Sequence, residues 1–456
     1  VMSRIHDSIL ETIGRTPHVR IQRLYDPGIS VWSKLERANP GGSIKDRIGV
    51  SMIEAAEARG ALKPGDAIVE ATAGNTGLGL ALVAAQKGYR MVLVVPDKMS
   101  QEKIFALRAM GAEVVLTRSD VAKGHPEYYQ DLGASIAKRT GAYFINQFEN
   151  PDNAKAHEDT TGPELWLQMQ ERLDAVVVGV GSSGTIAGLT HYFKRVAPHV
   201  EIVLADPEGS VLADYLTTGK LKESGSWLVE GIGEDFIPGI CDFSLTRRGY
   251  SIPDAESFTV ARELLHREGV LAGSSTGTLL ATALRYCREQ TTKKRVVTFA
   301  CDTGNRYLSK LFNDFWMHDQ GFTQRQSYGD LRDLIGRLHG EHATVTVGPD
   351  DVVATAHNRL RNAGFSQLPV MEGDRLIGIV TEDDIMRYAF GHPHRFKSPV
   401  RDAMTSTFLR VDKSQSVNNV VAMLEVRSSA AVMDADTFLG LITRADVLNY
   451  LRRQVQ

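Results

Sequence analysis

The sequence predicts an α/β protein followed by a smaller module that contains an internal repeat. Up to about residue 316, short β-branched and aliphatic runs alternate with segments whose apolar residues recur at helical spacing. This is the pattern of parallel strands joined by crossover helices. Beyond residue 330, two shorter stretches resemble each other. The length of 456 residues agrees with this division, because it suggests about three units of ~150 residues each.

The predicted strands are short apolar runs bounded by turn-forming residues. They lie at residues 67–70, 91–95, 113–116, 175–180, 201–205 and 296–299. The run at 175–180 is apolar apart from one glycine, which is typical of a strand that is buried on both faces.

Lys45 lies in the turn Asn-Pro-Gly-Gly-Ser-Ile-Lys-Asp-Arg at residues 39–47. Asn-Pro and Gly-Gly break regular structure, and Ser43 can cap a helix that begins there. A lysine in the first turn of a helix faces the positive end of the helix dipole, which disfavours its ammonium form. We therefore expect the pKa of Lys45 to be lowered, more so if it is buried, so that it can act as an amine nucleophile or base. A surface lysine after a turn is the alternative.

Two turns rich in small residues, each between a predicted strand and a predicted helix, are candidate anion sites. Residues 72–77 read Thr-Ala-Gly-Asn-Thr-Gly, and residues 181–185 read Gly-Ser-Ser-Gly-Thr. Such turns direct backbone N–H groups, hydroxyls and a helix N-terminus at one point, where phosphate or carboxylate can bind. Neither has the spacing of a dinucleotide-binding loop or a G-K-[ST] nucleotide loop, and tight packing alone would explain each by itself.

The repeat follows a polar, aperiodic stretch at residues 316–330, which predicts a linker. Residues 377–385 of the first copy match residues 439–447 of the second. Repeats this short cannot easily bury their own cores, so the copies should pack together. We therefore predict a first domain at 1–315, the linker at 316–330, and a module at 331–456 with copies at about 331–392 and 397–456.

Each copy carries a Thr-x-x-Asp sequence where a predicted strand meets a helix. The pairs are Thr381 with Asp384 and Thr443 with Asp446. The threonine can cap the helix and contact a phosphate, and the aspartate can accept both hydroxyls of a ribose. A simple capping box is the alternative.

Composition excludes several classes of function. The net charge is −3, from 52 Lys and Arg against 55 Asp and Glu, with no basic stripe, so no nucleic-acid partner is expected. No run of about eighteen apolar residues and no signal-peptide core occurs, which predicts a cytoplasmic protein without a membrane segment. Cys241, Cys287 and Cys301 have no metal-like spacing, so we expect no metal site and a reducing compartment.

Taken together, these segments resemble the fold-type II pyridoxal-phosphate enzymes of β-replacement, the family of cysteine synthase and cystathionine β-synthase. Matching stretches at residues 146–151, 157–162, 272–277 and 302–309 occur in the family's order. The loop at 230–238 is closer to the cystathionine β-synthase branch, and the repeat resembles a tandem pair of CBS domains, a Bateman module. The resemblance implies two parallel-sheet α/β lobes, which form the catalytic domain, followed by an α+β CBS pair.

The resemblance also implies how pyridoxal 5'-phosphate is bound. Lys45 would form a Schiff base with it, Asn75 would lie beside the ring's phenolic oxygen, and Ser275 would face the pyridine nitrogen. The phosphate would lie in the turn made by Gly181, Ser182, Ser183, Gly184 and Thr185. A serine hydroxyl cannot keep the ring nitrogen protonated as an aspartate would, so the ring is a weaker electron sink that suits α,β-elimination. His157 is expected to be structural rather than a second acid or base.

The substrate carboxylate would be bound by Thr72, Ala73, Gly74 and Thr76, with Gln147 opposite and Gly231 in the neighbouring loop. Many family members have serine at the position of Ala73, and the missing hydroxyl leaves serine and cysteine open as the first substrate. Lys45 would remove the α-proton and help the leaving group depart, and homocysteine would add to the resulting aminoacrylate to give cystathionine. Cysteine as first substrate would release hydrogen sulfide.

Two alternatives remain. A cysteine synthase that uses O-acetylserine or O-phosphoserine with sulfide shares the cofactor residues. An adenosyl-ligand sensor with an inactive catalytic scaffold is a different class, against which the intact Lys45, Asn75 and Ser275 argue.

The resemblance further implies a homodimer and an adenosyl ligand (S-adenosylmethionine, AMP or ATP) at the two Thr-x-x-Asp pairs. Ser366 stands where regulated members have an acidic residue, which leaves the identity of this ligand open. No haem is expected, because only a few residues precede Ile5 and Cys241 is the first cysteine.

Overall fold

The computed structural model describes residues 5–455 apart from residues 27, 73, 98 and 122. The chain forms two compact units that divide between Phe312 and Asn313. The α/β class predicted from the sequence is confirmed in the first unit, and the second unit contains the expected mixed α and β elements.

The first unit contains two sheets. One has the strand order β1-β2-β10-β7-β8-β9, in which β1 is antiparallel to β2 and the remaining pairs are parallel. The other has the order β5-β4-β3-β6 and is parallel throughout. The strands are β1 His18–Ile21, β2 Ser30–Lys34, β3 Ala67–Ala71, β4 Arg90–Pro96, β5 Glu113–Thr117, β6 Tyr143–Phe144, β7 Ala175–Gly179, β8 Glu201–Pro207, β9 Thr246–Ile252 and β10 Arg295–Phe299.

All six strands predicted from apolar runs are present. The strands that the sequence did not indicate include the edge strands β1 and β9 and the two-residue strand β6. The edge strands β1 and β9 contain exposed and half-buried residues that interrupt their apolar runs. In β9, for example, the buried ends are separated by exposed and half-buried residues.

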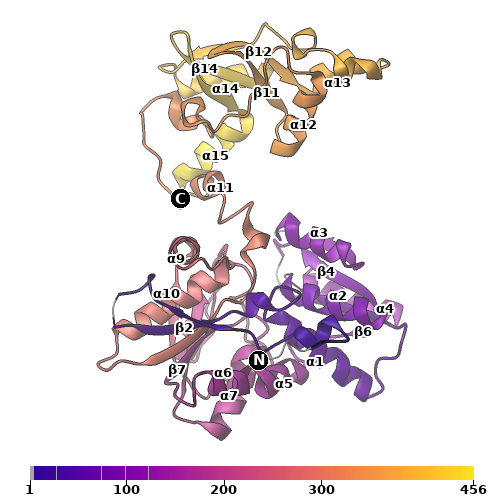
Figure 1. The fold of residues 1–456 in the computed structure, drawn as a ribbon, viewed down its shortest axis with the longest axis vertical. Coiled ribbons are helices and arrows are strands. Elements are labelled where there is room, and N and C mark those ends of the chain that lie inside the picture. Colours follow the sequence, from indigo (N-terminus) through magenta and orange to yellow (C-terminus); the bar gives the residue numbers. More distant parts are fainter. Residues whose placement is uncertain (1–4, 27, 73, 98, 122, 456) are drawn as a thin grey trace. The chain divides into compact units, whose positions relative to one another are not determined.

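Helices surround the two sheets of this unit. Figure 1 shows α1 to α4 grouped around β4 and β6, with α9 and α10 beside β2 and β7. The helices are α1 Lys45–Ala58, α2 Asn75–Lys87, α3 Gln101–Ala109, α4 Tyr129–Thr140, α5 Pro151–Ala156, α6 Gly162–Gln168, α7 Gly184–Val196, α8 Leu212–Thr218, α9 Asp254–Glu268 and α10 Ser274–Arg288, with a π-helix at His157–Thr161.

Helices α1 and α2 touch backbone to backbone, and this contact positions the site. A Cβ on Gly79 would lie 2.6 Å from the carbonyl oxygen of Lys45, and a Cβ on Gly49 would lie 2.8 Å from the backbone of Gly79. Apolar residues of α1, among them Ile48 and Met52, complete the core of this lobe together with residues of α2 and β4. The glycines therefore bring the first residues of α1 and α2 close together.

The second unit contains the two copies of the repeat. The hairpin β11 Gln367–Glu372 and β12 Arg375–Thr381 belongs to the first copy, and β13 Arg410–Asp412, β14 Ser429–Asp434 and β15 Thr437–Thr443 form the sheet of the second. The helices are α11 Asp314–Asp319, α12 Val353–Ala363, α13 Glu382–Ala389, α14 Val417–Val426 and α15 Arg444–Val455. Met371 and Leu376 pack in one buried cluster with Met433 and Phe438, so the copies pack together as predicted.

The stretch expected to be a linker differs from that expectation. Residues 316–330 begin inside α11, which Asn313 caps by accepting hydrogen bonds from Phe315 N (2.9 Å) and Trp316 N (3.3 Å). Asp319 also pairs with Arg453 of α15 at 3.4 Å. Capping and this ion pair order a segment that has no helical period of its own, and it belongs to the second unit.

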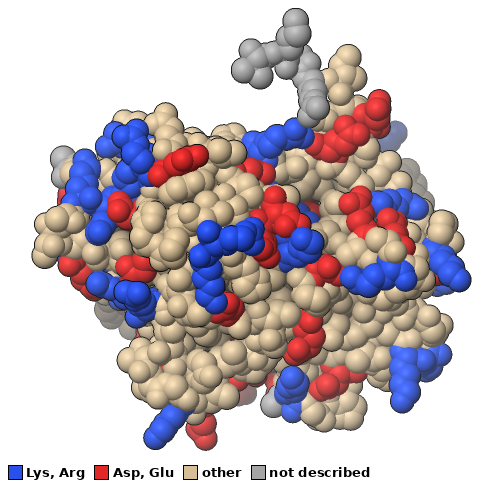
Figure 2. Space-filling model, turned by 90° about the horizontal axis from the view of Figure 1, so that it is seen from below, with Lys and Arg blue, Asp and Glu red and all other residues tan. Residues whose placement is uncertain are grey.

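Charges on the face seen in Figure 2 are mixed in sign, with Lys and Arg interspersed among Asp and Glu. In the part of the chain that the structure describes, no helix is long and apolar enough to cross a membrane. Nor do any three His, Cys, Asp or Glu side chains among these residues come together in a way that would hold a metal ion.

Candidate active site

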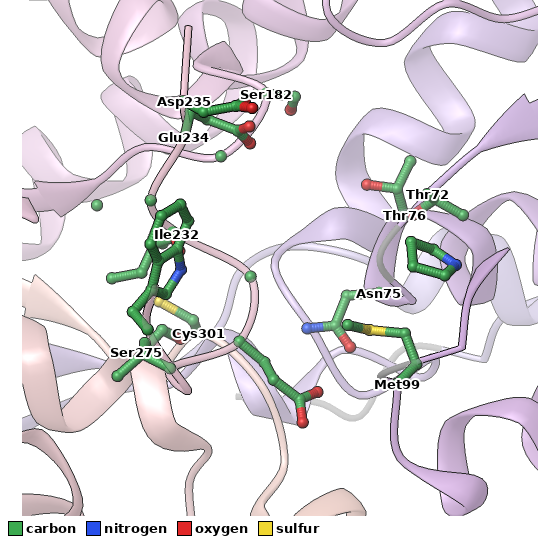
Figure 3. Close-up of a pocket in the computed structure, with 18 of the residues that line it drawn as sticks. Thr72, Asn75, Thr76, Met99, Ser182, Ile232, Glu234, Asp235, Ser275 and Cys301 are labelled. Carbon is green, nitrogen blue, oxygen red and sulfur yellow. The ribbon is translucent and has the colours of Figure 1, made fainter. Parts of the chain in front are cut away.

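A cavity of about 520 Å³ in the first unit brings the predicted turns together. Its walls include the turns that follow β3 and β7, the first residues of α1 and α10, and the loop at residues 224–235. Pockets of this size are typical of sites for small molecules and cofactors. Figure 3 shows Thr72, Thr76 and Asn75 on one side of the cavity and Ser275 and Cys301 on the other.

Lys45 is the first residue of α1, and its Nζ donates a hydrogen bond to Ser182 Oγ at 3.0 Å. Burial lowers the pKa of Lys45 to about 8, so the predicted direction is confirmed and desolvation is its main cause. The expectation that Ser43 is the N-cap is wrong by one residue, because the N-cap is Ile44. Ser43 pairs with Asp302 in a β-bridge, and its Oγ accepts from Lys45 N at 3.2 Å.

The turn at residues 181–185 has the form of an anion cradle. Ser183 adopts a left-handed conformation with φ 64°, and α7 begins at Gly184. A Cβ on Gly184 would lie 1.8 Å from Asn153 Oδ1, and one on Gly181 would lie 2.7 Å from the Gly231 carbonyl oxygen, so both positions need glycine. Ser182 Oγ accepts from Lys45 and from Asn153 Nδ2, which leaves its own hydrogen free to donate into the cavity.

These residues fit a cofactor that carries both a phosphate and a carbonyl group. Backbone N–H groups at a helix start and hydroxyl donors suit the phosphate, and the amine of Lys45 beside them suits the carbonyl carbon. Asn153 was missed by the sequence analysis. It lies between the matching stretches at 146–151 and 157–162, and nothing in the sequence indicates that its side chain reaches the turn after β7.

His157 supports the same turn. Its Nδ1 lies 2.9 Å from Thr161 Oγ1 and its Nε2 lies 3.3 Å from Thr185 Oγ1. Burial, followed by the charges of Arg47 and Lys45, lowers the pKa of His157 to about 3. The ring is therefore neutral at physiological pH, and its fully buried place agrees with the expected structural role.

The turn after β3 is held by its own side chains. Thr72 Oγ1 accepts from Gly74 N at 3.1 Å, and Gly74 has a φ of 121°, which favours glycine. Thr76 Oγ1 donates to Gln147 Oε1 at 2.7 Å, so the structure brings Gln147 against the turn. Gln147 N donates in turn to Glu70 Oε2 at 3.0 Å, and burial raises the pKa of Glu70 to about 8. Ala73 lies outside the described residues.

Asn75 and Ser275 stand at the starts of α2 and α10 and line the same cavity. Asn75 Nδ2 donates to Asp302 Oδ2 at 2.7 Å. Ser275 is buried beside Cys301, whose thiol pKa is raised to about 12 by burial, so the thiol is uncharged. The sequence analysis predicted both residues as site members but not the roles of Asp302 and Cys301.

The loop at 224–235 adds acidic groups that the sequence analysis used only for classification. Gly231, with φ 88°, lines the cavity as predicted. Figure 3 shows Glu234 and Asp235 close to Ser182 in the wall of the cavity. In the sequence, the only indication that this loop contributes acidic groups to the cavity is the adjacent pair Glu234 and Asp235 beside glycines.

Lys103 of α3 was also missed. Its side chain is almost completely buried, and its Nζ donates to Glu230 Oε2 at 2.5 Å and to Tyr307 Oη at 3.1 Å. Lys310 donates to the other Glu230 oxygen at 2.6 Å. The stem of Lys103 fills the space next to Gly74, because a Cβ there would lie 2.8 Å from Lys103 Cδ. One lysine therefore connects the turn after β3 with the loop at 224–235.

The Thr-x-x-Asp pairs lie in the second unit and show the hydrogen bonds of helix caps. Asp384 Oδ2 accepts from Thr381 N at 3.0 Å and from Thr381 Oγ1 at 2.7 Å. Asp446 Oδ2 accepts from Thr443 N at 2.8 Å and from Thr443 Oγ1 at 2.6 Å. The bonds of the capping-box alternative are thus present in both copies.

Comparison with known proteins agrees with this geometry. The family of pyridoxal-phosphate dependent enzymes matches residues 9–302, and CBS domains match residues 341–391 and 400–453. The chain belongs to the pyridoxal-phosphate dependent enzymes.

Within that family, relatives that share both parts of the chain are cystathionine beta-synthases. The chain is 34% identical to that of Dictyostelium discoideum, over 99% of this chain and 93% of the relative. It is 33% identical to that of Saccharomyces cerevisiae, over 97% of each. Cysteine synthase B of Escherichia coli is 42% identical, but covers 66% of this chain and 93% of that protein. Among solved structures, the O-acetylserine dependent cystathionine beta-synthase from Helicobacter pylori has a TM-score of 0.62 and 35% identity, covering 68% of this chain and 99% of that one.

Proposed function

We propose that the chain condenses serine or cysteine with homocysteine to give cystathionine, in a β-replacement that depends on pyridoxal phosphate. The observation that carries this proposal is that one cavity is lined by Lys45, by the two turns predicted to bind anions and by an acidic loop. The CBS repeat that follows the catalytic part in the sequence supports it, because the cystathionine beta-synthases match nearly the full chain, including this repeat.

Pyridoxal phosphate, when bound, supplies an electron sink for negative charge at the α-carbon of an amino acid. Gly181, Ser182, Ser183, Gly184 and Thr185 would hold its phosphate, Ser275 its ring nitrogen and Asn75 its ring oxygen.

Lys45 would serve as the base. Its lowered pKa of about 8 leaves part of the amine neutral near physiological pH, so it can accept the α-proton of the substrate. The same group can then return a proton to the departing hydroxyl or thiol of the first substrate.

The first substrate's carboxylate would bind at the turn formed by Thr72, Ala73, Gly74 and Thr76. Thr72 Oγ1 accepts from Gly74 N, so its own hydrogen remains available to donate to a carboxylate. Gln147 fixes the turn through its bond with Thr76.

The acidic loop favours an amino-acid thiol as the second substrate. Glu234 and Asp235 lie in the cavity wall, where a carboxylate can accept a charge-assisted hydrogen bond from the ammonium group of homocysteine. Inorganic sulfide has no ammonium group and would gain nothing from these residues.

The 42% identity to cysteine synthase B over the catalytic part supports cysteine synthesis from O-acetylserine and sulfide as the second candidate. The deciding assay crosses three donors (serine, cysteine and O-acetylserine) with two acceptors (homocysteine and sulfide) and identifies products by mass spectrometry. Cystathionine from serine or cysteine is expected, and Lys45→Ala should abolish it. Cysteine formed only from O-acetylserine and sulfide would contradict the proposal.

We further propose that residues 1–315 form the catalytic part and 331–456 a Bateman module that binds S-adenosylmethionine, AMP or ATP at Thr381, Asp384, Thr443 and Asp446. Calorimetric titration of the full chain with each ligand tests the module. If none of the three ligands binds, the module has a structural role. We also propose a homodimer without haem. Sedimentation analysis checks the dimer, and a Soret band in proportion to chain concentration would contradict the absence of haem.

A further inference from the structure

The stretch at residues 302–309 matches the family but has no role in the scheme above. It follows β10 and includes Asp302 and the 3₁₀ helix Gly304–Tyr307. Three of its side chains, Asp302, Arg306 and Tyr307, are buried, although two of them are charged residue types. Buried charged groups are costly unless they are paired, so their partners indicate what the stretch does.

Two of these charged groups hold the side-chain amide of Asn75 from opposite ends. Asn75 Nδ2 donates to Asp302 Oδ2 at 2.7 Å, and Arg306 Nη1 donates to Asn75 Oδ1 at 2.7 Å. A flipped amide would place its N–H hydrogens against the guanidinium and its oxygen against the carboxylate. Both contacts would then be repulsive, so the amide has a single favourable orientation.

The two clamping groups are themselves fixed next to Lys45 and Ser275. Tyr307 Oη donates to Asp302 Oδ2 at 2.6 Å, and Asp302 pairs with Ser43 in a β-bridge. Arg306 also donates to the Gly41 carbonyl oxygen. A Cβ on Gly273 would lie 2.1 Å from Asp302 Oδ1, so this carboxylate is packed tightly against the start of α10.

One hydrogen of the Asn75 amide group remains unassigned in this arrangement. A side-chain NH2 group has two hydrogens, and Asp302 takes one. The side chain lines the cavity, and Figure 3 shows it on the wall opposite Ser275 and Cys301.

We propose that Asp302 and Arg306 are positioning residues that orient the Asn75 amide, so that its second N–H hydrogen is donated to the phenolic oxygen of the cofactor ring. The inference rests on the proposed function, which places Asn75 beside that oxygen. A hydrogen bond to the deprotonated oxygen favours that form, so its loss raises the pH at which the bound cofactor titrates.

The test is a double-mutant cycle read by absorbance of the resting holoenzyme across pH. Asn75→Ala and Arg306→Met should each raise the titration midpoint of the bound cofactor by ~1–2 pH units, the size of one lost hydrogen bond to a charged group. The double variant should have the same midpoint as Asn75→Ala alone, because Arg306 acts only through Asn75. Arg306→Lys, which keeps a cationic donor, should recover part of the shift.

Arg262→Met is the matched control, because Arg262 donates to the Leu311 carbonyl oxygen at 2.8 Å in the same unit. It should leave the midpoint unchanged. Asp302→Leu tests the other end of the clamp and decides the matter if Arg306→Met does not fold, since it removes the acceptor of the Asn75 bond and keeps a side chain of similar size. Its midpoint should rise in the same direction.

An unchanged midpoint in Arg306→Met or Asp302→Leu would overturn the inference, as would additive shifts in the double variant. Failure of the proposed function can be told apart from failure of this inference. A holoenzyme that shows the coupled midpoints but makes no cystathionine would refute the reaction and leave the positioning role intact.

Discussion

Cofactor loading should depend on pH in a way that the burial of Lys45 sets. The ordinary lysine pKa near 10.5 falls to about 8 because the amine is buried in the cavity. At pH 7 roughly one tenth of the side chain is then neutral, against roughly 0.03% for an ordinary lysine, a difference on the order of 300-fold. The neutral amine is the nucleophile, so the rate of covalent attachment of pyridoxal phosphate should rise about tenfold per pH unit below 8 and level off above it.

The assay mixes cofactor-free protein with pyridoxal phosphate at fixed concentration from pH 6 to 10 and follows absorbance. Dividing each rate by that of a simple primary amine in the same buffer removes the contribution of the cofactor's own ionisation. After correction for the amine's own titration, the protein curve should break near pH 8. Lys45→Ala should show no covalent attachment. A rate that climbs without a break to pH 10 would refute the argument that burial depresses this pKa.

Three further predictions concern the residues around the cavity. Lys103→Met should raise the KM of the first substrate severalfold in steady-state kinetics. The reason is that the ion pair with Glu230 no longer supports the turn after β3. Arg47→Ala should lower the free energy of unfolding, measured in guanidinium chloride, by about 3–5 kcal/mol, because the buried carboxylate of Glu36 loses its arginine partner. Gly184→Ala should weaken retention of pyridoxal phosphate on dialysis, because Asn153 Oδ1 occupies the position of the new Cβ.

Each of these variants has a matched control. Lys310→Met removes the more exposed partner of the same glutamate and should affect KM less. Arg118→Ala breaks an exposed ion pair and should leave the unfolding free energy almost unchanged. Gly340→Ala adds a methyl group where no atom lies within 4 Å and should leave cofactor retention unchanged. If a variant and its control behave alike, the burial or packing argument behind that prediction fails.

The sequence alone determined the features that depend on short-range pattern. Apolar runs located the strands β3, β4, β5, β7, β8 and β10, and all of these except the edge strand β5 lie inside their sheets, where a strand that is buried on both faces needs a continuous apolar run. Glycine and hydroxyl residues after β3 and β7 indicated the two turns that the structure places in one cavity with Lys45. The edge strands β1 and β9 were missed because exposed and half-buried residues interrupt their apolar runs.

Only the tertiary structure decided which distant side chains meet. Lys103 and Glu230 lie 127 residues apart in the sequence, and Asn75 and Arg306 lie 231 apart, yet each pair forms a hydrogen bond. No local pattern indicates such pairs, because a charged side chain in a helix or loop looks like a surface residue until the fold buries it. The lowered pKa of Lys45 shows both contributions. The sequence placed the lysine at a helix start, but burial by residues from elsewhere in the chain, which removes the amine from water, is the main cause of the shift.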